Sequence, residues 1–256
     1  MTNQTDRPLL TVLLFASLIV CISMGIRHTF GLFLAPMTQD HGWSREVFAL
    51  AIALQNLAWG ASQPFFGLIA DRYGARRVLW AGAALYALGL AGMAWATSGT
   101  GLAASAGLLI GLAQSGTTYS VVFSAMSRLL PPARISWAMG IVAAAGSFGQ
   151  FLMVPVGAGM IGGIGWFGTL LGFSLLALAM VPLGAALTRG LQPGAAHAGQ
   201  SAMAAVREAL GERSFLLLAT GYFVCGFQVV FMGVHLPSYL LDKGFSANLG
   251  MTSLAL

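Results

Sequence analysis

The sequence predicts an all-α integral membrane protein built as a bundle of helices. Apolar side chains make up 57% of its 256 residues and charged side chains only 7%, whereas soluble domains carry about a quarter charged residues. The apolar residues also gather in long runs, and a bilayer core about 30 Å thick needs roughly 20 such residues per helix. Composition and run length together exclude the ordinary soluble classes.

Seven apolar runs follow one another along the chain, near residues 9–36, 47–70, 78–97, 101–127, 136–161, 165–188 and 214–240. Each predicts a transmembrane helix, because an isolated segment in lipid satisfies its backbone polar groups only as a helix. An eighth run begins near Phe245 and stops at Leu256, too soon to cross the hydrocarbon. We therefore expect an incomplete protein, whose C-terminal half is a missing partner of this one.

The Lys and Arg residues divide unequally between the two ends of these helices. Counted through successive connections, one side holds only Arg45 and Lys243. The other holds Arg7, Arg72, Arg76, Arg77, Arg128, Arg134, Arg189, Arg207 and Arg213. The positive-inside rule then predicts a cytoplasmic N-terminus in a multi-pass protein of the inner (plasma) membrane. The net charge of +5 reflects this topology, so we expect the lipid bilayer and no nucleic acid as a partner.

Three regions follow from the same map. Residues 1–188 form a predicted six-helix bundle, 189–213 a cytoplasmic linker, and 214–256 the start of a second bundle. A short amphipathic helix from about Ser201 to Glu212 is expected to lie on the membrane surface. A six-helix block, a linker and the start of another block resemble half of a duplicated transporter.

One connection, FGLIADRYGARRV at 66–78, crowds charge into a few positions of an otherwise apolar chain. Its distinctive residues are Gly67, Asp71, Arg72, Gly74, Arg76 and Arg77. Asp71 can accept hydrogen bonds from backbone N–H groups or from Arg72 and Arg76. The two flanking glycines suit a turn between closely packed helices. A loop that only fixes topology would explain the arginines, but neither Asp71 nor the glycine spacing.

This loop resembles the signature between helices 2 and 3 of the major facilitator superfamily, G-x-x-x-D-R-x-G-R-R in outline. Ala75 stands where a basic residue is common. The resemblance implies a major facilitator-type bundle, here the N-terminal six-helix half, helix 7 and the start of helix 8. It also implies that these loop residues form a cytoplasmic latch between two halves, made and broken during alternating access. Asp71 would be its pivot, with a partner mostly beyond Leu256.

Two further stretches, GLFLAPMTQDHGWSRE (31–46) and GFQVVFMGVHLPSYLLDKG (226–244), resemble the bacterial relatives of monocarboxylate and oxalate/formate transporters. That resemblance implies a secondary active transporter for a small organic anion, a carboxylate, driven by proton coupling or anion exchange. The alternative is a non-transporting remnant or a half-length membrane scaffold.

Polar residues inside the apolar runs are the candidate substrate contacts, because such residues are costly in lipid. Arg27 is the only formally charged one, and its planar guanidinium matches a carboxylate, although it could also snorkel toward the outer interface. The remaining candidates are His28, Gln114, Tyr119, Gln228 and His235. His235 could couple proton movement to transport, or be a neutral histidine bonded between helices. The arginine that the superfamily often places in helix 4 is absent, with Leu112 in that neighbourhood.

No sequence pattern indicates catalysis. There is no H-E-x-x-H, Cys/His cluster or catalytic triad, and acidic side chains are absent from the seven predicted spans. A G-x-G-x-x-G match at 157–162 lies inside an apolar run and has Pro182 where an acidic ribose ligand is expected. We therefore expect no enzyme, no metal site and no cofactor.

Overall fold

The computed structural model describes residues 9–191 and 202–246, and this part of the chain consists of helices and short connections. The first half of the bundle contains α1 (Leu9–His28), α2 (Phe30–His41), α3 (Arg45–Tyr73), α4 (Ala75–Ala94), α5 (Gly99–Leu102), the π-helical η1 (Ala103–Leu109), α6 (Ile110–Thr117) and α7 (Tyr119–Leu129). The rest contains α8 (Pro132–Leu178), α9 (Met180–Leu187), α10 (Ala202–Gly211) and α11 (Arg213–Asp242). The all-α membrane bundle predicted from composition is confirmed.

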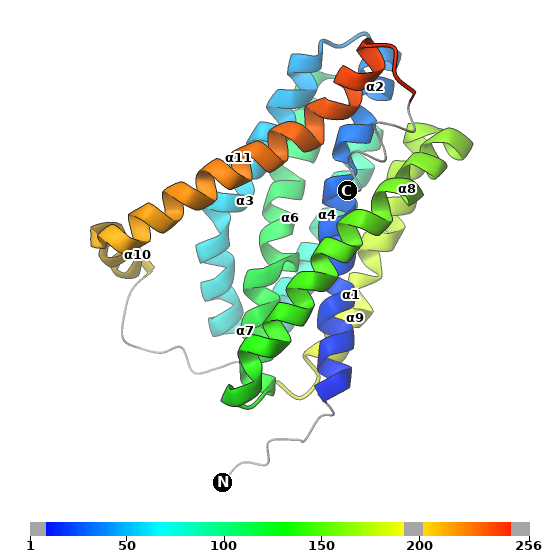
Figure 1. Cartoon of the computed structure of the whole chain (residues 1–256). Coiled ribbons are helices and arrows are strands. Elements are labelled where there is room, and N and C mark those ends of the chain that lie inside the picture. The colour runs from blue at the N-terminus through cyan, green and yellow to red at the C-terminus, as the bar shows by residue number, and fades with distance from the viewer. Residues whose placement is uncertain (1–8, 192–201, 247–256) are drawn as a thin grey trace.

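Each of the seven predicted apolar runs is helical. Five segments are long and apolar enough to cross a membrane: Leu9–His41, Ala75–Ala94, Gly99–Leu129, Pro132–Leu187 and Arg213–Asp242. The fourth reverses direction at Gly165, whose backbone is non-helical at φ 74° and ψ 171°, and so forms two antiparallel passes (Figure 1). Helix α3 is less apolar but has 29 residues, or about 43 Å of helix, enough to cross as well.

Small residues let the helix backbones approach each other closely. A Cβ at Gly149 would lie 2.2 Å from the Cys21 carbonyl oxygen, and one at Gly111 would lie 2.6 Å from the Gln55 carbonyl oxygen. Gln55 also donates a 2.7 Å hydrogen bond to the Ala106 carbonyl and so links two helices. These contacts join α1 to α8 and α3 to the η1–α6 segment. Such close packing is expected in a membrane, where van der Waals contacts rather than the hydrophobic effect hold helices together.

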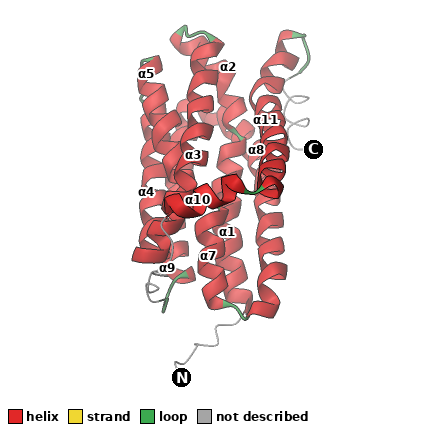
Figure 2. Cartoon of the chain, turned by 90° about the vertical axis from the view of Figure 1, so that its left-hand side faces the viewer, coloured by secondary structure: helices red, strands yellow, loops and turns green. Residues whose placement is uncertain are grey.

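Helix α11 stands apart from the bundle. It crosses the front of the other helices obliquely and ends beside α2 (Figure 1). Only Val234, Pro237 and Ser238 are buried along it. Helix α10 runs across the direction of the bundle helices (Figure 2). Its residues are nearly the same as those of the amphipathic helix predicted in the linker. Residues 192–201 of that linker, and the predicted eighth run after Ser246, lie outside the described residues.

Two contacts hold the end of α11 against the bundle. Arg45, at the start of α3, makes a two-pronged ion pair with Asp242, in which Nη2 donates to Oδ1 at 2.7 Å. Gly31 of α2 meets the backbone of Gly233, and a Cβ on Gly31 would lie 2.1 Å from the Gly233 carbonyl oxygen. We call this end of the bundle the Arg45 end, and the opposite end of α3 the Asp71 end.

Substitution of these two glycines is expected to have unequal effects on stability. Gly31→Ala should lower the stability of the folded chain by about 1–3 kcal/mol, because its methyl group meets backbone that cannot rotate away. Gly233→Ala is the matched control, since among the described residues its Cβ would have only His28 Cε1 within 4 Å, at 3.9 Å. Thermal unfolding of the purified chain in detergent measures both; equal midpoints for the two variants would contradict the observed packing.

Candidate functional site

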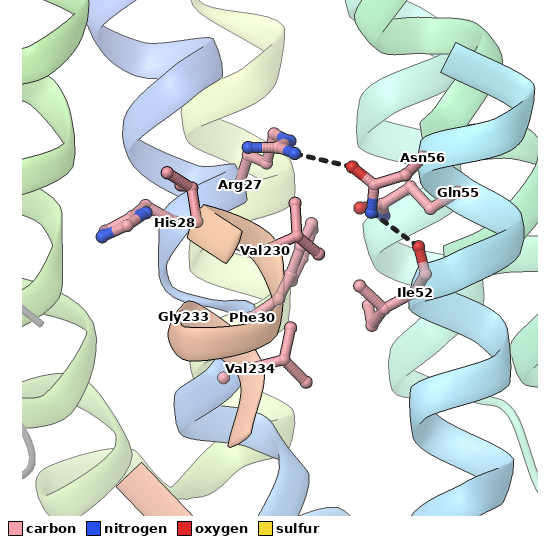
Figure 3. A pocket seen from close by; sticks show the side chains of 11 residues that line it. Arg27, His28, Phe30, Ile52, Gln55, Asn56, Val230, Gly233 and Val234 are labelled. Atoms are coloured by element: carbon pink, nitrogen blue, oxygen red, sulfur yellow. Dashed lines mark hydrogen bonds between the residues drawn. The ribbon is translucent and has the colours of Figure 1, made fainter. Parts of the chain in front are cut away.

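A cavity of about 590 Å³ lies between α1, α3 and α11. Its lining from α11 is mostly apolar and aromatic and includes Tyr222, Phe227 and Phe231, whereas α1 and α3 contribute Arg27, Asn56 and Trp59. A smaller cavity of about 30 Å³ adjoins it and shares Arg27 and Asn56 (Figure 3). Binding sites for small molecules usually have this size and character, with a few polar groups on an apolar wall.

Arg27 is the charged group of this cavity. It sits at the end of α1, two residues before Thr29 interrupts the helix, and Nη2 donates a 2.7 Å hydrogen bond to Asn56 Oδ1 (Figure 3). Its guanidinium lies over the Trp59 ring at 4.6 Å. Its Nε is buried without a hydrogen-bond partner among the described residues. The snorkelling alternative does not describe this arrangement, because the guanidinium is directed toward α3.

Asn56 and Trp59 orient this arginine. Asn56 Nδ2 donates to the Ile52 carbonyl at 2.8 Å, which points its Oδ1 toward Arg27. Trp59 Nε1 donates to Thr118 Oγ1 at 3.3 Å, at the residue where α6 ends and the backbone becomes extended. Neither Asn56 nor Trp59 is among the site residues predicted from the sequence. Their separation of three residues, which places both on one face of α3, was the available signal.

The other predicted substrate residues are dispersed. His235 lines the larger cavity together with Arg27, and its ring packs against Phe231. Tyr119 lies within electrostatic range of Arg27 but is not among the residues lining either of the two cavities. His28 lines the smaller cavity and points away from the Arg27 side chain (Figure 3).

Two glutamines lie outside both cavities. Gln114 is fully buried, and its side chain lies beside that of Tyr86. Gln228 is exposed on α11. Seven-residue spacing brings Gln228 and His235 toward one side of a helix, but of the two only His235 lines the cavity. The role of both glutamines as substrate contacts stays a prediction without a geometric argument.

At the Asp71 end, the predicted pivot has a partner within the described chain. Asp71 Oδ1 accepts hydrogen bonds from Arg128 Nη2 and from Ser124 Oγ, each at 3.0 Å. Both partners lie on α7. Arg72 and Arg76, two of the donors that the sequence offers to Asp71, do not pair with it in this structure. Their guanidiniums lie over the rings of Tyr73 and Trp80 instead.

The two glycines that flank Asp71 have different roles. Gly74 separates α3 from α4 with φ 94° and ψ 136°, a conformation that disfavours any side chain. Gly67 lies inside α3, and a Cβ there would meet no atom of the described chain within 4 Å. Close helix packing within this part of the chain therefore does not explain Gly67, and the expectation that both glycines serve it needs this correction.

A matched pair of substitutions tests this difference. Gly74→Ala should destabilise the folded chain by about 1–3 kcal/mol through backbone strain. Gly67→Ala should leave stability unchanged or raise it by up to about 1 kcal/mol, because alanine is the better helix former. The measurement is again thermal unfolding in detergent, and a larger loss at Gly67 than at Gly74 would contradict the assignment.

Comparison with known proteins agrees with this fold. Residues 13–256 match the model of the Major Facilitator Superfamily. The fold resembles the inward-open xylose transporter XylE from E. coli, with TM-score 0.61, 16% identity and coverage of 96% of this chain and 67% of that one. It also resembles a peptide transporter POT in complex with alafosfalin, with TM-score 0.59, 18% identity and coverage of 92% and 49%.

Among named relatives, human monocarboxylate transporter 11 is 29% identical over 80% of this chain and 42% of its own length. Rat monocarboxylate transporter 13 is 28% identical over 86% of this chain and 51% of its own length. The chain thus spans about half the length of the relatives it matches. These relatives are transporters and not enzymes, in agreement with the expectation from sequence. The family match covers nearly the whole chain, and the chain belongs to the major facilitator superfamily.

Proposed function

We propose that the protein containing this chain is a secondary active transporter that moves a small carboxylate by alternating access. The observation that carries the proposal is Arg27, a partly buried cation in a mostly apolar cavity. Its Nε is fully buried, and its guanidinium has no carboxylate partner among the described residues. A charge at membrane depth without such a partner is costly, and a bound anion would offset that cost. The resemblance to monocarboxylate transporters supports the same class of substrate.

The coupling follows from His235. Its imidazole lines the same cavity as Arg27 and has a ring nitrogen that can take up a proton. A proton on His235 could therefore accompany the anion; direct exchange of one anion for another is the second mode. In either mode the site would open alternately at the Arg45 end and the Asp71 end.

The orientation and the latch belong to the same proposal. The Asp71 end would face the cytoplasm of a plasma-membrane protein, as the distribution of Lys and Arg favours. Asp71, held by Arg128 of the same half, and the glycine turn would form this half's side of the cytoplasmic latch, and the Arg45–Asp242 pair would close the other end. A second six-helix half, supplied by the same protein, would complete the cavity opposite α1 and α3.

Counterflow in proteoliposomes tests the function. Vesicles containing the native gene product and loaded with an unlabelled monocarboxylate should accumulate the labelled one, and should not accumulate labelled xylose or a dipeptide. An inward proton gradient should speed uptake if His235 couples protons and leave exchange unchanged if it does not. A correctly inserted product that accumulates no anion would overturn the proposal and favour the scaffold reading.

A further inference from the structure

A second cavity, of about 390 Å³, lies at the Asp71 end of the bundle. It shares no lining residue with the cavity at Arg27. Its walls come from the turn between α3 and α4, the first turns of α4, the end of α7 and the chain after α9. The lining residues are Tyr73, Gly74, Ala75, Arg76, Arg77, Trp80, Arg128, Thr188 and Leu191.

The charged residues that line this cavity are all positive. Three of its lining residues are arginines and none is acidic. Arg76 and Arg77 make no ion pair with any residue in 9–191 or 202–246, and Arg128 pairs with Asp71 through Nη2 alone. Each guanidinium has five N–H donors, so most of the donors around the cavity remain available to an anion.

The start of α4 adds a second and independent feature. Gly74 places no capping side chain there, and the first turn of this 20-residue helix has no acidic residue. A helix N-terminus presents free N–H groups and a partial positive charge, which arginines in the first turn reinforce. Free N–H groups combined with cationic side chains form a recurrent setting for phosphate.

The cavity is bordered by aromatic residues of the kind that favours the depth of lipid headgroups. Trp80 is 37% exposed, and its Nε1 donates a 3.0 Å hydrogen bond to the Val181 carbonyl. Arg76 lies over the same ring at 4.4 Å, and Tyr73 is 48% exposed at the rim. Tryptophan and tyrosine favour the membrane interface, and basic pockets between transmembrane helices at that level suit anionic headgroups.

We propose that this cavity binds the phosphate of an anionic phospholipid, held by Arg76, Arg77 and Arg128. Because Arg128 is also the partner of Asp71, the bound phosphate shares a guanidinium with the latch and shifts the strength of the Asp71–Arg128 pair. The chemistry recognised is a phosphate anion, and the source is the lipid headgroup rather than free phosphate. Lipid binding does not depend on what the protein transports, so it can fail or succeed independently of the proposed function.

Native mass spectrometry of the purified chain tests the site. Phosphatidylglycerol should bind more tightly than phosphatidylcholine, and inorganic phosphate at the same concentration should not displace it. The double variant Arg76→Gln/Arg77→Gln should weaken phosphatidylglycerol binding by roughly 10- to 30-fold. Arg134→Gln is the matched control, because it removes an exposed arginine at the same end that does not line the cavity, and it should leave binding unchanged.

Every other outcome is decisive. Equal binding of both lipids, or an equal loss in Arg134→Gln, would overturn the site. Displacement by inorganic phosphate would assign the cavity to a soluble anion. If the double variant does not fold, the single variant Arg77→Gln, at an exposed position, replaces it. Unchanged phosphatidylglycerol binding in a folded Arg77→Gln chain would also overturn the proposal.

Discussion

Replacing Arg27 by glutamine is expected to abolish most carboxylate transport. The substitution keeps a hydrogen-bond donor near Asn56 but removes the only formal charge inside the predicted spans. Hydrogen bonds to charged groups contribute about 1.5–3 kcal/mol, so substrate affinity should fall roughly 10- to 150-fold. The measurement is the concentration dependence of counterflow in proteoliposomes, which separates weaker binding from slower turnover.

Arg27→Lys provides the control for charge. Lysine keeps the positive charge but loses the planar fork that pairs with a carboxylate and stacks on Trp59. We expect partial transport with a raised half-saturation concentration. Arg134→Gln, which removes an exposed arginine far along the chain, should transport normally. If Arg27→Gln transports with unchanged half-saturation, Arg27 is a structural residue and the substrate binds elsewhere.

Asp71→Asn is expected to stop transport while leaving the fold intact. The side chains of Asp71 and Arg128 are 51% and 31% exposed, so their ion pair contributes at most about 1 kcal/mol to stability. Asparagine can still accept the hydrogen bond from Ser124 but leaves Arg128 without its charge partner. Thermal unfolding should shift little, whereas counterflow should fall by at least an order of magnitude if the pair operates the latch.

Arg128→Gln tests whether Arg128 is the partner of Asp71 on which transport depends. If the latch requires the Asp71–Arg128 pair, this variant should lose transport to the same extent as Asp71→Asn. If the functional partner of Asp71 lies in the second half of the protein, Arg128→Gln should transport normally while Asp71→Asn does not. Normal transport by both variants would remove Asp71 from the mechanism altogether.

Much of this architecture could be predicted from the sequence because it depends on composition and local pattern. A helix that crosses lipid must be predominantly apolar, so the seven runs locate the helices to within a few residues. The loop at 66–78 identifies the superfamily through residues that are close together in the chain. Arg27 was recognisable because a charge at membrane depth is exceptional.

The partners of these residues could not be predicted, because contacts between helices depend on rotation, tilt and spacing that no local pattern contains. Asp71 lies 57 positions from Arg128, and Arg45 lies 197 positions from Asp242. The different roles of Gly67 and Gly74 likewise depend on a dihedral angle and on an open space. The sequence by itself determined the membrane class, the helices and the family. The tertiary structure alone decided which polar groups meet. The reason is that each helix can turn any of several faces toward its neighbours with almost the same local free energy.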